Sequence, residues 1–211
     1  MSSFRPALVL AAIAAIVSAL VIITYNITYV DTSAILTDKQ AAAAVAVYGG
    51  AEEDYSVMPV ADWQPILHAD ENSDLCRVKK IISHKDGSLA FEVVVKGYKE
   101  GYDILVGVKD GAVAGLSVIS TGEETPNLGT KTADPTYLES FIGADGTVTI
   151  VRSAPKSDNE IQAVTGATYS SKGVASAVNI ALEAYKTLNE ARTLAVLPEN
   201  AEDTHLGGDT E

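Results

Sequence analysis

The stretch from Asp103 to Ile119, DILVGVKDGAVAGLSVI, decides the fold class. Two runs that are rich in β-branched residues flank the tripeptide Lys109-Asp110-Gly111, and Asp-Gly between such runs is a strong hairpin signal. Strands joined by so short a turn must be antiparallel, because a parallel pair needs a crossover of about a dozen residues. The stretch therefore predicts an antiparallel hairpin.

The same pattern continues on both sides of this hairpin. Short turn segments, Lys85 to Ser88 and Gly97 to Tyr102, separate further β-like runs. The expected strands are Val78 to His84, Leu89 to Lys96, Asp103 to Val108, Ala112 to Ile119 and Thr147 to Val151. The expected fold class is α+β, with a central antiparallel sheet and flanking helices.

Helical segments are expected before and after these strands. An Ala-rich helix is predicted from Thr37 to Val47, where Gly49-Gly50 stops it, and a short helix is predicted from Tyr137 to Ile142. Thr121 to Pro135 has the composition of a loop. The segment from Glu52 to Asp74 has no clear periodicity and stays unassigned.

The last predicted element is an amphipathic helix that runs to about Leu194. Its apolar positions recur at helical spacing and form one buried stripe. They are Val174, Val178, Ala181, Leu182, Tyr185 and Leu188. Ser170 or Ser171 is the expected N-cap, which places Thr168 just before the first turn, near unpaired N–H groups and the positive end of the helix dipole.

The N-terminal segment is long and apolar enough to cross a membrane. No charged residue lies between Arg5 and Asp31, and residues 7–27 are mostly Ala, Val, Ile and Leu. Crossing about 30 Å of hydrocarbon needs roughly 20 such residues. A cleaved signal peptide and a buried helix are the alternatives, but the run exceeds the ~7–15 residues of a signal core. We expect an uncleaved anchor in contact with membrane lipid.

Charge and composition predict the arrangement of the rest. Arg5 in a short leader favours a single-pass protein of the cell (inner or cytoplasmic) membrane with its N-terminus in the cytoplasm. The expected parts are an anchor at residues 1–30, an extracytoplasmic domain at 31–195 and an acidic, flexible tail at 196–211. With a formal net charge of −13 and no basic stripe, nucleic acid is not an expected partner.

Most catalytic and metal-binding patterns are missing from the sequence. There is no G-x-S-x-G, P-loop or G-x-G-x-x-G motif, and the three histidines show no metal-ligand spacing. No metal site is therefore expected. The single cysteine, Cys76, excludes an intramolecular disulfide and is typical of a small buried hydrophobe.

The peptide Thr165-Gly-Ala-Thr168 has two possible roles. Small residues before a helix let the backbone approach an anion, so that free N–H groups can bind a phosphate. Plain helix capping is the alternative, because many helices begin with small residues followed by Ser or Thr. The peptide alone does not decide between a binding site and a cap.

Two longer stretches carry a resemblance to a known family. Gly107 to Ser120 leads into Glu124-Thr-Pro-Asn-Leu-Gly129, which looks like an ETPGLG loop, and Thr165 to Thr168 is similar to a D-x-x-(S/T)-G-A-T flavinylation signature. In this order and spacing the chain resembles the G subunit of Rnf-type electron-transport complexes and its relative, the C subunit of sodium-pumping quinone reductases.

The resemblance implies a covalent FMN, joined through its phosphate to Thr168 by a separate flavin transferase. Thr168 would then need no neighbouring base. The expected binding residues are Thr165, Gly166, Ala167, Tyr169, Ser170 and Ser171, with Glu124, Thr125, Leu128 and Gly129 lining the ring or its approach. Lys131 either compensates the phosphate charge or is a solvated surface lysine. No catalytic residue is expected in this chain.

Two positions depart from the family pattern. Gln162 stands where the signature has Asp, which puts recognition by the attaching enzyme in doubt. Asn127 stands where the loop commonly has Gly, a mild change because Asn tolerates positive φ.

The resemblance implies an electron-carrying subunit of a membrane-bound, ion-translocating ferredoxin:NAD+ oxidoreductase. Its partners would be the other integral membrane and redox subunits. Two alternatives stay open: a stand-alone anchored flavoprotein that reduces a small extracytoplasmic acceptor, and an anchored ligand-binding or scaffold domain without flavin.

Overall fold

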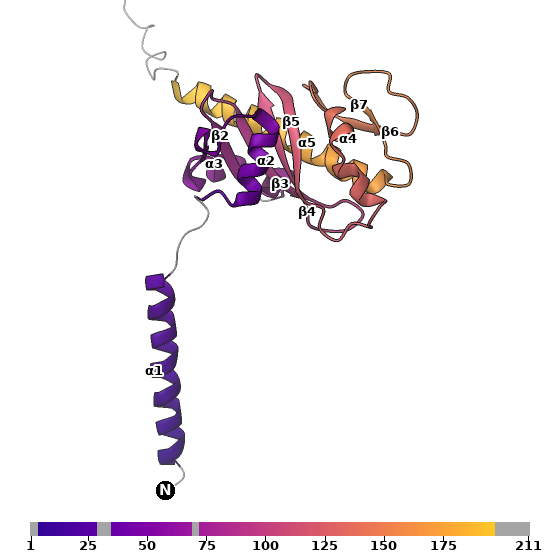
Figure 1. The fold of residues 1–211 in the computed structure, drawn as a ribbon. Coiled ribbons are helices and arrows are strands. Elements are labelled where there is room, and N and C mark those ends of the chain that lie inside the picture. The colour runs from indigo at the N-terminus through magenta and orange to yellow at the C-terminus, as the bar shows by residue number, and fades with distance from the viewer. Residues whose placement is uncertain (1–3, 29–34, 69–71, 197–211) are drawn as a thin grey trace, which may run out of the picture. The chain divides into compact units, whose positions relative to one another are not determined.

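The computed structural model describes residues 4–28, 35–68 and 72–196 (Figure 1). Residues 4–28 belong to one compact unit, and the other described residues belong to a second. In the first unit, helix α1 (Phe4–Thr28) is 25 residues long, which corresponds to about 37 Å. Its window Leu8–Tyr25 has a mean hydropathy of 2.7 and is long and apolar enough to span a membrane, a test that a signal sequence would also pass.

The second unit is built on a five-stranded antiparallel sheet with the order β1-β2-β3-β4-β5. The strands are β1 (Tyr55–Val57), β2 (Val78–His84), β3 (Leu89–Val95), β4 (Tyr102–Lys109) and β5 (Ala112–Ser120). Each strand pairs with the next one along the chain. The hairpin prediction from the Asp-Gly turn is confirmed, since Asp110 and Gly111 both adopt positive φ between β4 and β5.

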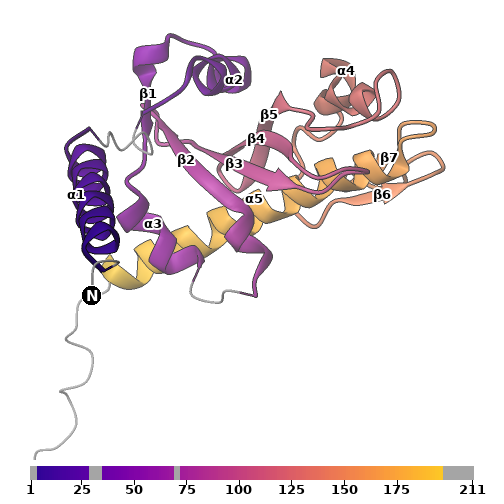
Figure 2. The ribbon, with the colours of Figure 1, turned by 90° about the horizontal axis from the view of Figure 1, so that it is seen from below.

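Helices cover both faces of this sheet. The long helix α5 (Thr168–Val196) runs along one face, and α2 (Asp38–Tyr48) lies on the other (Figure 2). Alternate side chains of β3 pack on opposite faces of the sheet. Phe91 and Val93 belong to the core on the α5 side, whereas Ala90 packs with Ala44 of α2. This period of two is what a sheet buried on both faces requires.

The predicted α2 helix is confirmed with both of its ends. Thr37 and Gln40 form a capping box, in which the Thr37 hydroxyl accepts from the Gln40 N–H and the Gln40 side chain accepts from the Thr37 N–H. Gly49, at φ +78°, ends the helix and donates its N–H to the Val45 carbonyl.

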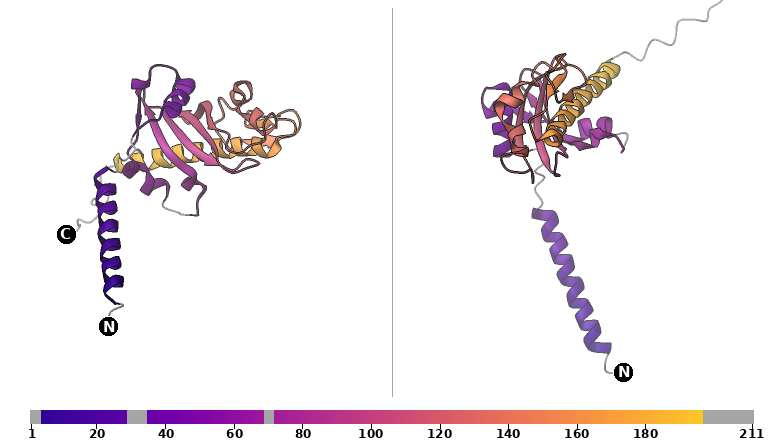
Figure 3. Two further views of the ribbon diagram at one scale, coloured as in Figure 1. Left: turned by 60° about the horizontal axis from the view of Figure 1, so that its bottom comes forward. Right: turned by 90° about the vertical axis from the view of Figure 1, so that its right-hand side faces the viewer.

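The segment that was unassigned from the sequence, Glu52 to Asp74, contains three short elements in its described part. A 3-10 turn, η2 (Glu52–Asp54), leads into β1, and α3 (Val60–Leu67) then packs against α5 (Figure 3). Trp63 and Leu67 are the buried residues of α3. A second 3-10 turn, η3 (Asp74–Arg77), precedes β2.

The part between β5 and α5 differs in detail from the prediction. The expected loop ends in a 3-10 turn, η4 (Gly129–Ala133), and the short helix α4 spans Pro135–Glu139 rather than Tyr137 to Ile142. The earlier start follows from the Asp134 side chain, which caps the helix by accepting from the Thr136 N–H, with Pro135 in the first position.

A small second sheet was not expected from the sequence. Strand β6 (Thr149–Val151) lies within the predicted strand, but it pairs in parallel with β7 (Glu160–Gln162). The central sheet is antiparallel as predicted, and this parallel pair is an addition next to the start of α5 (Figure 1).

Candidate functional site

Thr168 is the first residue of α5, a helix of 29 residues. Gly166, at φ +81°, turns the chain just before the helix, and the buried Ala167 follows it. The first recorded backbone bond of the helix runs from the Ser171 N–H to the Ala167 carbonyl, at 2.9 Å. The N–H groups of residues 168–170 therefore have no intrahelical acceptor, and they lie at the positive end of the helix dipole.

The predicted capping role of Ser170 and Ser171 is wrong. Both residues lie inside the first turn of α5 and are fully buried. The Ser171 hydroxyl accepts from the Val164 N–H at 3.1 Å, and the Ser170 hydroxyl donates to Glu124 at 2.7 Å. Both side chains thus fasten neighbouring loops to the helix start, because tertiary partners replace the local N–H groups that a cap would bind.

Glu124 connects three segments at this end of the molecule. One carboxylate oxygen accepts from Ser170 of α5, and the other accepts from the backbone N–H of Lys99 at 3.0 Å. The side chain is 5% exposed. Its carboxylate is therefore engaged by the protein, and it holds the β3–β4 turn, the 124–129 loop and the helix together.

Two glycines make room for this carboxylate. A Cβ atom at Gly97 would lie 2.3 Å from one oxygen of Glu124, and a Cβ atom at Gly129 would lie 2.2 Å from the other. Neither position could hold a larger residue without moving Glu124. The Gly129 that the sequence placed near the flavin ring thus has a packing role in the loop.

The loop from Thr125 to Gly129 is held by its own hydrogen bonds. The N–H groups of Leu128 and Thr130 donate to the Thr125 carbonyl, and the Asn127 N–H donates to the Thr130 hydroxyl. Asn127 has φ +58°, so the expectation that this departure is tolerated agrees with the structure.

A buried pair of hydroxyls supports the loop from below. Thr132 donates to the Gly129 carbonyl at 2.7 Å, so the Tyr102 hydroxyl, 2.8 Å away, donates to Thr132. Burial raises the pKa of Tyr102 to about 12, which keeps its hydroxyl protonated as a donor.

A cavity of about 290 Å³ lies between this loop and the start of α5. Its lining contains predicted residues from both motifs together with one that the sequence reasoning missed. The lining residues are Tyr98, Glu124, Thr125, Leu128, Gly129, Gly166, Ala167, Tyr169 and Ser170. The structure therefore joins two motifs about 40 residues apart in the sequence.

Tyr98 is the residue that was missed. It lies in the turn after β3, 58% exposed, and its ring centroid is 6.4 Å from that of Tyr169, which is 68% exposed. Two large aromatic side chains thus remain open to solvent beside the cavity. The signal in the sequence was the Gly97-Tyr98 pair, which was read only as part of a turn.

Three residues that the sequence analysis singled out lie at a different groove. Thr165, Gln162 and Lys131 line a cavity of about 1,060 Å³ that also includes Tyr137. Lys131 and Gln162 are exposed. Thr168 is half-buried and absent from the lining of both cavities, but its neighbours Ala167 and Tyr169 line the smaller one.

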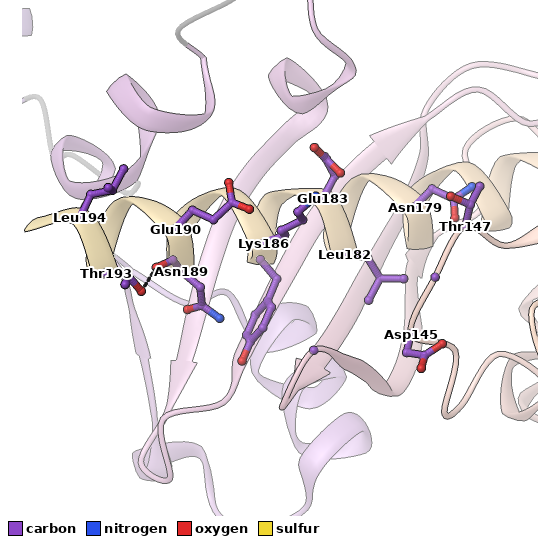
Figure 4. Close-up of a pocket in the computed structure, with 13 residues that line it drawn as sticks. Asp145, Thr147, Asn179, Leu182, Glu183, Lys186, Asn189, Glu190, Thr193 and Leu194 are labelled. Carbon is purple, nitrogen blue, oxygen red and sulfur yellow. Dashed lines mark hydrogen bonds between the residues drawn. The ribbon is translucent and has the colours of Figure 1, made fainter.

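Another cavity, of about 780 Å³, lies along the C-terminal half of α5 (Figure 4). Its lining includes Leu182, Lys186 and Leu194 of the helix, with Asp145 and Thr147 from the loop before β6. Leu182 is 14 residues beyond Thr168, which corresponds to about 21 Å along the helix. The lining of this cavity contains none of the predicted site residues.

Histidine and cysteine side chains were not expected to bind a metal. No group of three or more His, Cys, Asp or Glu residues suited to a metal ion occurs in the described part of the chain. The ring of His84 lies 5.6 Å from that of Tyr48, and its Nδ1 is 2.8 Å from Asp86. Cys76 is half-buried rather than fully buried as expected, and His205 lies outside the described residues.

Comparison with known proteins now identifies the family. Residues 97–183 match the model of the FMN-binding domain, a span that contains both motifs. The chain is 31% identical over 148 residues to the G subunit of the Na(+)-translocating ferredoxin:NAD(+) oxidoreductase complex of Acetobacterium woodii, an alignment that covers 65% of this chain and 70% of that protein.

The chain belongs to the G-subunit family of Rnf complexes. As a member of this family with one long apolar N-terminal helix, it is a membrane-anchored protein with an FMN-binding domain. Two solved structures are also similar. NqrC from Shewanella oneidensis is 21% identical, with a TM-score of 0.46 over 58% of this chain and 67% of that one. The C subunit of the Na(+)-translocating NADH-quinone reductase from Parabacteroides distasonis is 18% identical, with a TM-score of 0.40 over 58% of this chain and 66% of that one.

Proposed function

We propose that this protein is the electron-carrying G subunit of an ion-translocating ferredoxin:NAD+ oxidoreductase, with FMN joined to Thr168 by a phosphoester bond. The single observation that carries the proposal is the position of Thr168. Thr168 begins a long helix whose first N–H groups have no intrahelical acceptor, and it lies directly beside a cavity that both family motifs line. The family relationship supports the same conclusion.

The residues at the site fit a flavin nucleotide in three respects. The free N–H groups at the start of α5 can donate to phosphate oxygens, and Gly166 and Ala167 leave space for close approach. The exposed rings of Tyr98 and Tyr169 and the side chain of Leu128 offer apolar surface to a ring system.

The bound FMN would supply the redox chemistry, by accepting and passing on electrons. The chain would position it and limit its exposure. A cavity of about 290 Å³ is too small to enclose an FMN, so part of the ring would face outward, toward neighbouring redox subunits. Covalent attachment would keep the cofactor at high effective concentration in an extracytoplasmic domain.

Four further features belong to the same proposal. A flavin transferase would attach the FMN, although Gln162 replaces the acid of the usual signature. Residues 7–27 would lie in membrane lipid, the N-terminus would be cytoplasmic and the FMN-binding domain extracytoplasmic. The other subunits of the complex would be the electron partners.

The orientation is tested with protease. In sealed, inside-out membrane vesicles the domain should be protected from added protease, and its digestion would contradict this orientation.

The attachment is tested in protein purified from native membranes. Intact-mass measurement is expected to give an excess of one FMN less one water, and denaturing gels are expected to show a fluorescent band. Thr168→Ala should abolish both signals, whereas the control Thr193→Ala, which removes an exposed hydroxyl near the other end of the same helix, should keep them. A fluorescent band in the Thr168 variant, or an unmodified mass in the native protein, would overturn the proposal.

A further inference from the structure

Two acidic side chains lie on the α2 side of the central sheet, away from the candidate flavin site. Glu92 of β3 is 7% exposed and Asp103 of β4 is half-buried. They share this face with Ala90 and Leu105, which form an apolar cluster against α2. In the strand register Glu92 lies opposite Leu105, and Asp103 lies opposite Val94, so the two acids are diagonal neighbours on adjacent strands.

The hydrogen bonds around the pair are unevenly distributed. Glu92 accepts from the side-chain amide of Gln40 at 2.5 Å, whereas Asp103 has a buried carboxylate oxygen that receives no hydrogen bond from a donor in the described part of the chain. After burial, the nearby charge of Glu92 is the main cause that raises the pKa of Asp103, so the two carboxyl groups are close enough to interact. Two carboxylates this close, both partly removed from water, cannot both ionise without a large cost.

A lysine that could neutralise the pair is engaged elsewhere. Lys80 of β2 lies directly opposite Glu92 in the register. Its ammonium group instead donates to the Ile35 carbonyl at 2.8 Å and to the side-chain oxygen of Gln40 at 3.1 Å. That same oxygen accepts the Thr37 N–H at 3.0 Å in the capping box of α2. Lys80 therefore helps to hold residues 35–40 on the sheet.

The charged groups that face the pair come from β2, since α2 contributes only the uncharged Gln40 to these contacts. Lys79 lowers the pKa of both carboxyl groups and Lys80 lowers that of Glu92, each with a smaller effect than burial. Burial, and then the charge of Glu92, raise the pKa of Asp103 to about 7, and burial also raises the pKa of Glu92. The position of Lys80 thus matches a pair that carries one proton.

We propose that Glu92 and Asp103 share a single proton, and that its release draws Lys80 from Ile35 and Gln40 to the carboxylates and frees the Ile35 carbonyl. The proton passes to solvent, and the charge of the pair changes from −1 to −2. The lysine opposite Glu92 then gains two anionic acceptors in place of a carbonyl and an amide oxygen, both uncharged. No bond to the flavin and no electron transfer is involved.

The consequence concerns the chain that joins the domain to the anchor. Residues 35–37 are the first described residues after α1. Release of Ile35 would add the two residues before the Thr37 cap, about 7 Å of extended chain, to the connection between the two units. The proton on this pair would therefore control the length of free chain between the anchor and the domain. We call the pair and the Lys80 contacts the latch. It depends on the described contacts alone and stands whether or not FMN is attached to Thr168.

The latch is tested by nuclear magnetic resonance on the full chain in lipid nanodiscs, between pH 5 and 9. Side-chain carboxyl carbons report the protonation of Glu92 and Asp103, and the Thr37 backbone amide reports the capping box. We expect the carboxyl signals and the Thr37 amide to shift with one common midpoint near pH 7. Carboxyl signals that stay ionised over this whole range, as an ordinary pKa of about 4 would give, would overturn the proposal. So would a Thr37 signal that does not follow the carboxyls.

A variant tests the cause. Asp103→Asn removes the shared proton, so the Thr37 signal is expected to stay constant over this pH range. Glu139→Gln, an exposed acid on α4, is the matched control and should leave the wild-type midpoint in place. An unchanged Thr37 titration in the Asp103 variant would overturn the proposal. The wild-type titration decides the question without any variant if Asp103→Asn fails to fold.

Discussion

The hydroxyl of Ser170 donates to the carboxylate of Glu124 across 2.7 Å, a buried contact between residues 46 positions apart in the sequence. It joins the first turn of α5 to the loop from the other family motif. The cavity between these segments depends on this contact, because Glu124 also holds the β3–β4 turn through the Lys99 N–H.

Removal of this hydroxyl should destabilise the domain. Ser170→Ala leaves one oxygen of a buried carboxylate without its donor, a change that typically costs about 1–3 kcal/mol. Urea unfolding is the measurement. The control Thr193→Ala deletes an exposed hydroxyl on the same helix that bonds its own backbone, and it should change stability by less than about 0.5 kcal/mol. Equal stability of the two variants would contradict the role of Ser170.

Gly129 should not accept a methyl group. In Gly129→Ala the new Cβ atom would lie 2.2 Å from Glu124 and 3.0 Å from the Ser170 hydroxyl, so both must shift. We expect a loss of about 1–3 kcal/mol in the free energy of unfolding, as for other overpacked sites. Gly146→Ala is a suitable comparison, since its new Cβ atom would meet only the end of the Asn159 side chain. A larger loss at Gly146 than at Gly129 would refute this account.

The stability of the domain should depend on the Glu92–Asp103 pair between about pH 4 and 7. Asp103 has a raised pKa of about 7 in the folded protein, so the folded state binds the proton more tightly than the unfolded state. The stabilisation is complete below the unfolded value of about 4 and is lost as the pH rises through 7. After allowance for solvent screening, the loss should be roughly 1–2 kcal/mol.

This dependence is measured by urea unfolding at a series of pH values. Asp103→Asn should give a flatter profile over that range and a higher stability than the wild type at pH 8. A wild-type profile that rises between pH 4 and 7 would contradict the sign of the effect, provided that Glu139→Gln follows the wild type.

Tyr98 should affect the flavin environment without affecting attachment. If FMN occupies the cavity beside Tyr98, Tyr98→Leu removes an aromatic contact. We expect the covalent mass increment to be kept, with a shifted visible absorption spectrum and a changed reduction potential. Tyr137→Phe, in the neighbouring groove, removes a hydroxyl for which no hydrogen bond is found within the described residues, and it should leave both properties unchanged. The reverse result would place the ring in the groove of Tyr137.

The central sheet and α2 could be predicted because their signals are local. Asp110-Gly111 specifies the turn between its own flanking strands, and Thr37 with Gln40 specifies the helix start within four residues. The three-residue strands β1 and β7 were missed, since such short runs show no period. The short α3 was also missed, and it contains Pro65, which normally opposes a helix interior.

The details of the site were less predictable, because tertiary contacts decide them. Serine is a residue type typical of helix caps, but the hydroxyl of Ser170 instead donates to Glu124, which lies 46 positions away in the sequence. The same holds for Gly129, whose packing against Glu124 is invisible in the loop sequence. The start of α5 was predicted three or four residues too late, because Thr168 is already its first residue. The neighbours of Thr168 and the 124–129 loop line one cavity, as the two motifs had indicated.

The uninterrupted length of α5 makes it a molecular ruler. At about 1.5 Å per residue, Arg192 lies roughly 36 Å along the axis from Thr168. A dye attached near that position would sit at a fixed separation from a chromophore at the other end of the helix. Energy transfer between them would report where the chromophore resides, in intact membranes and without isolating the protein.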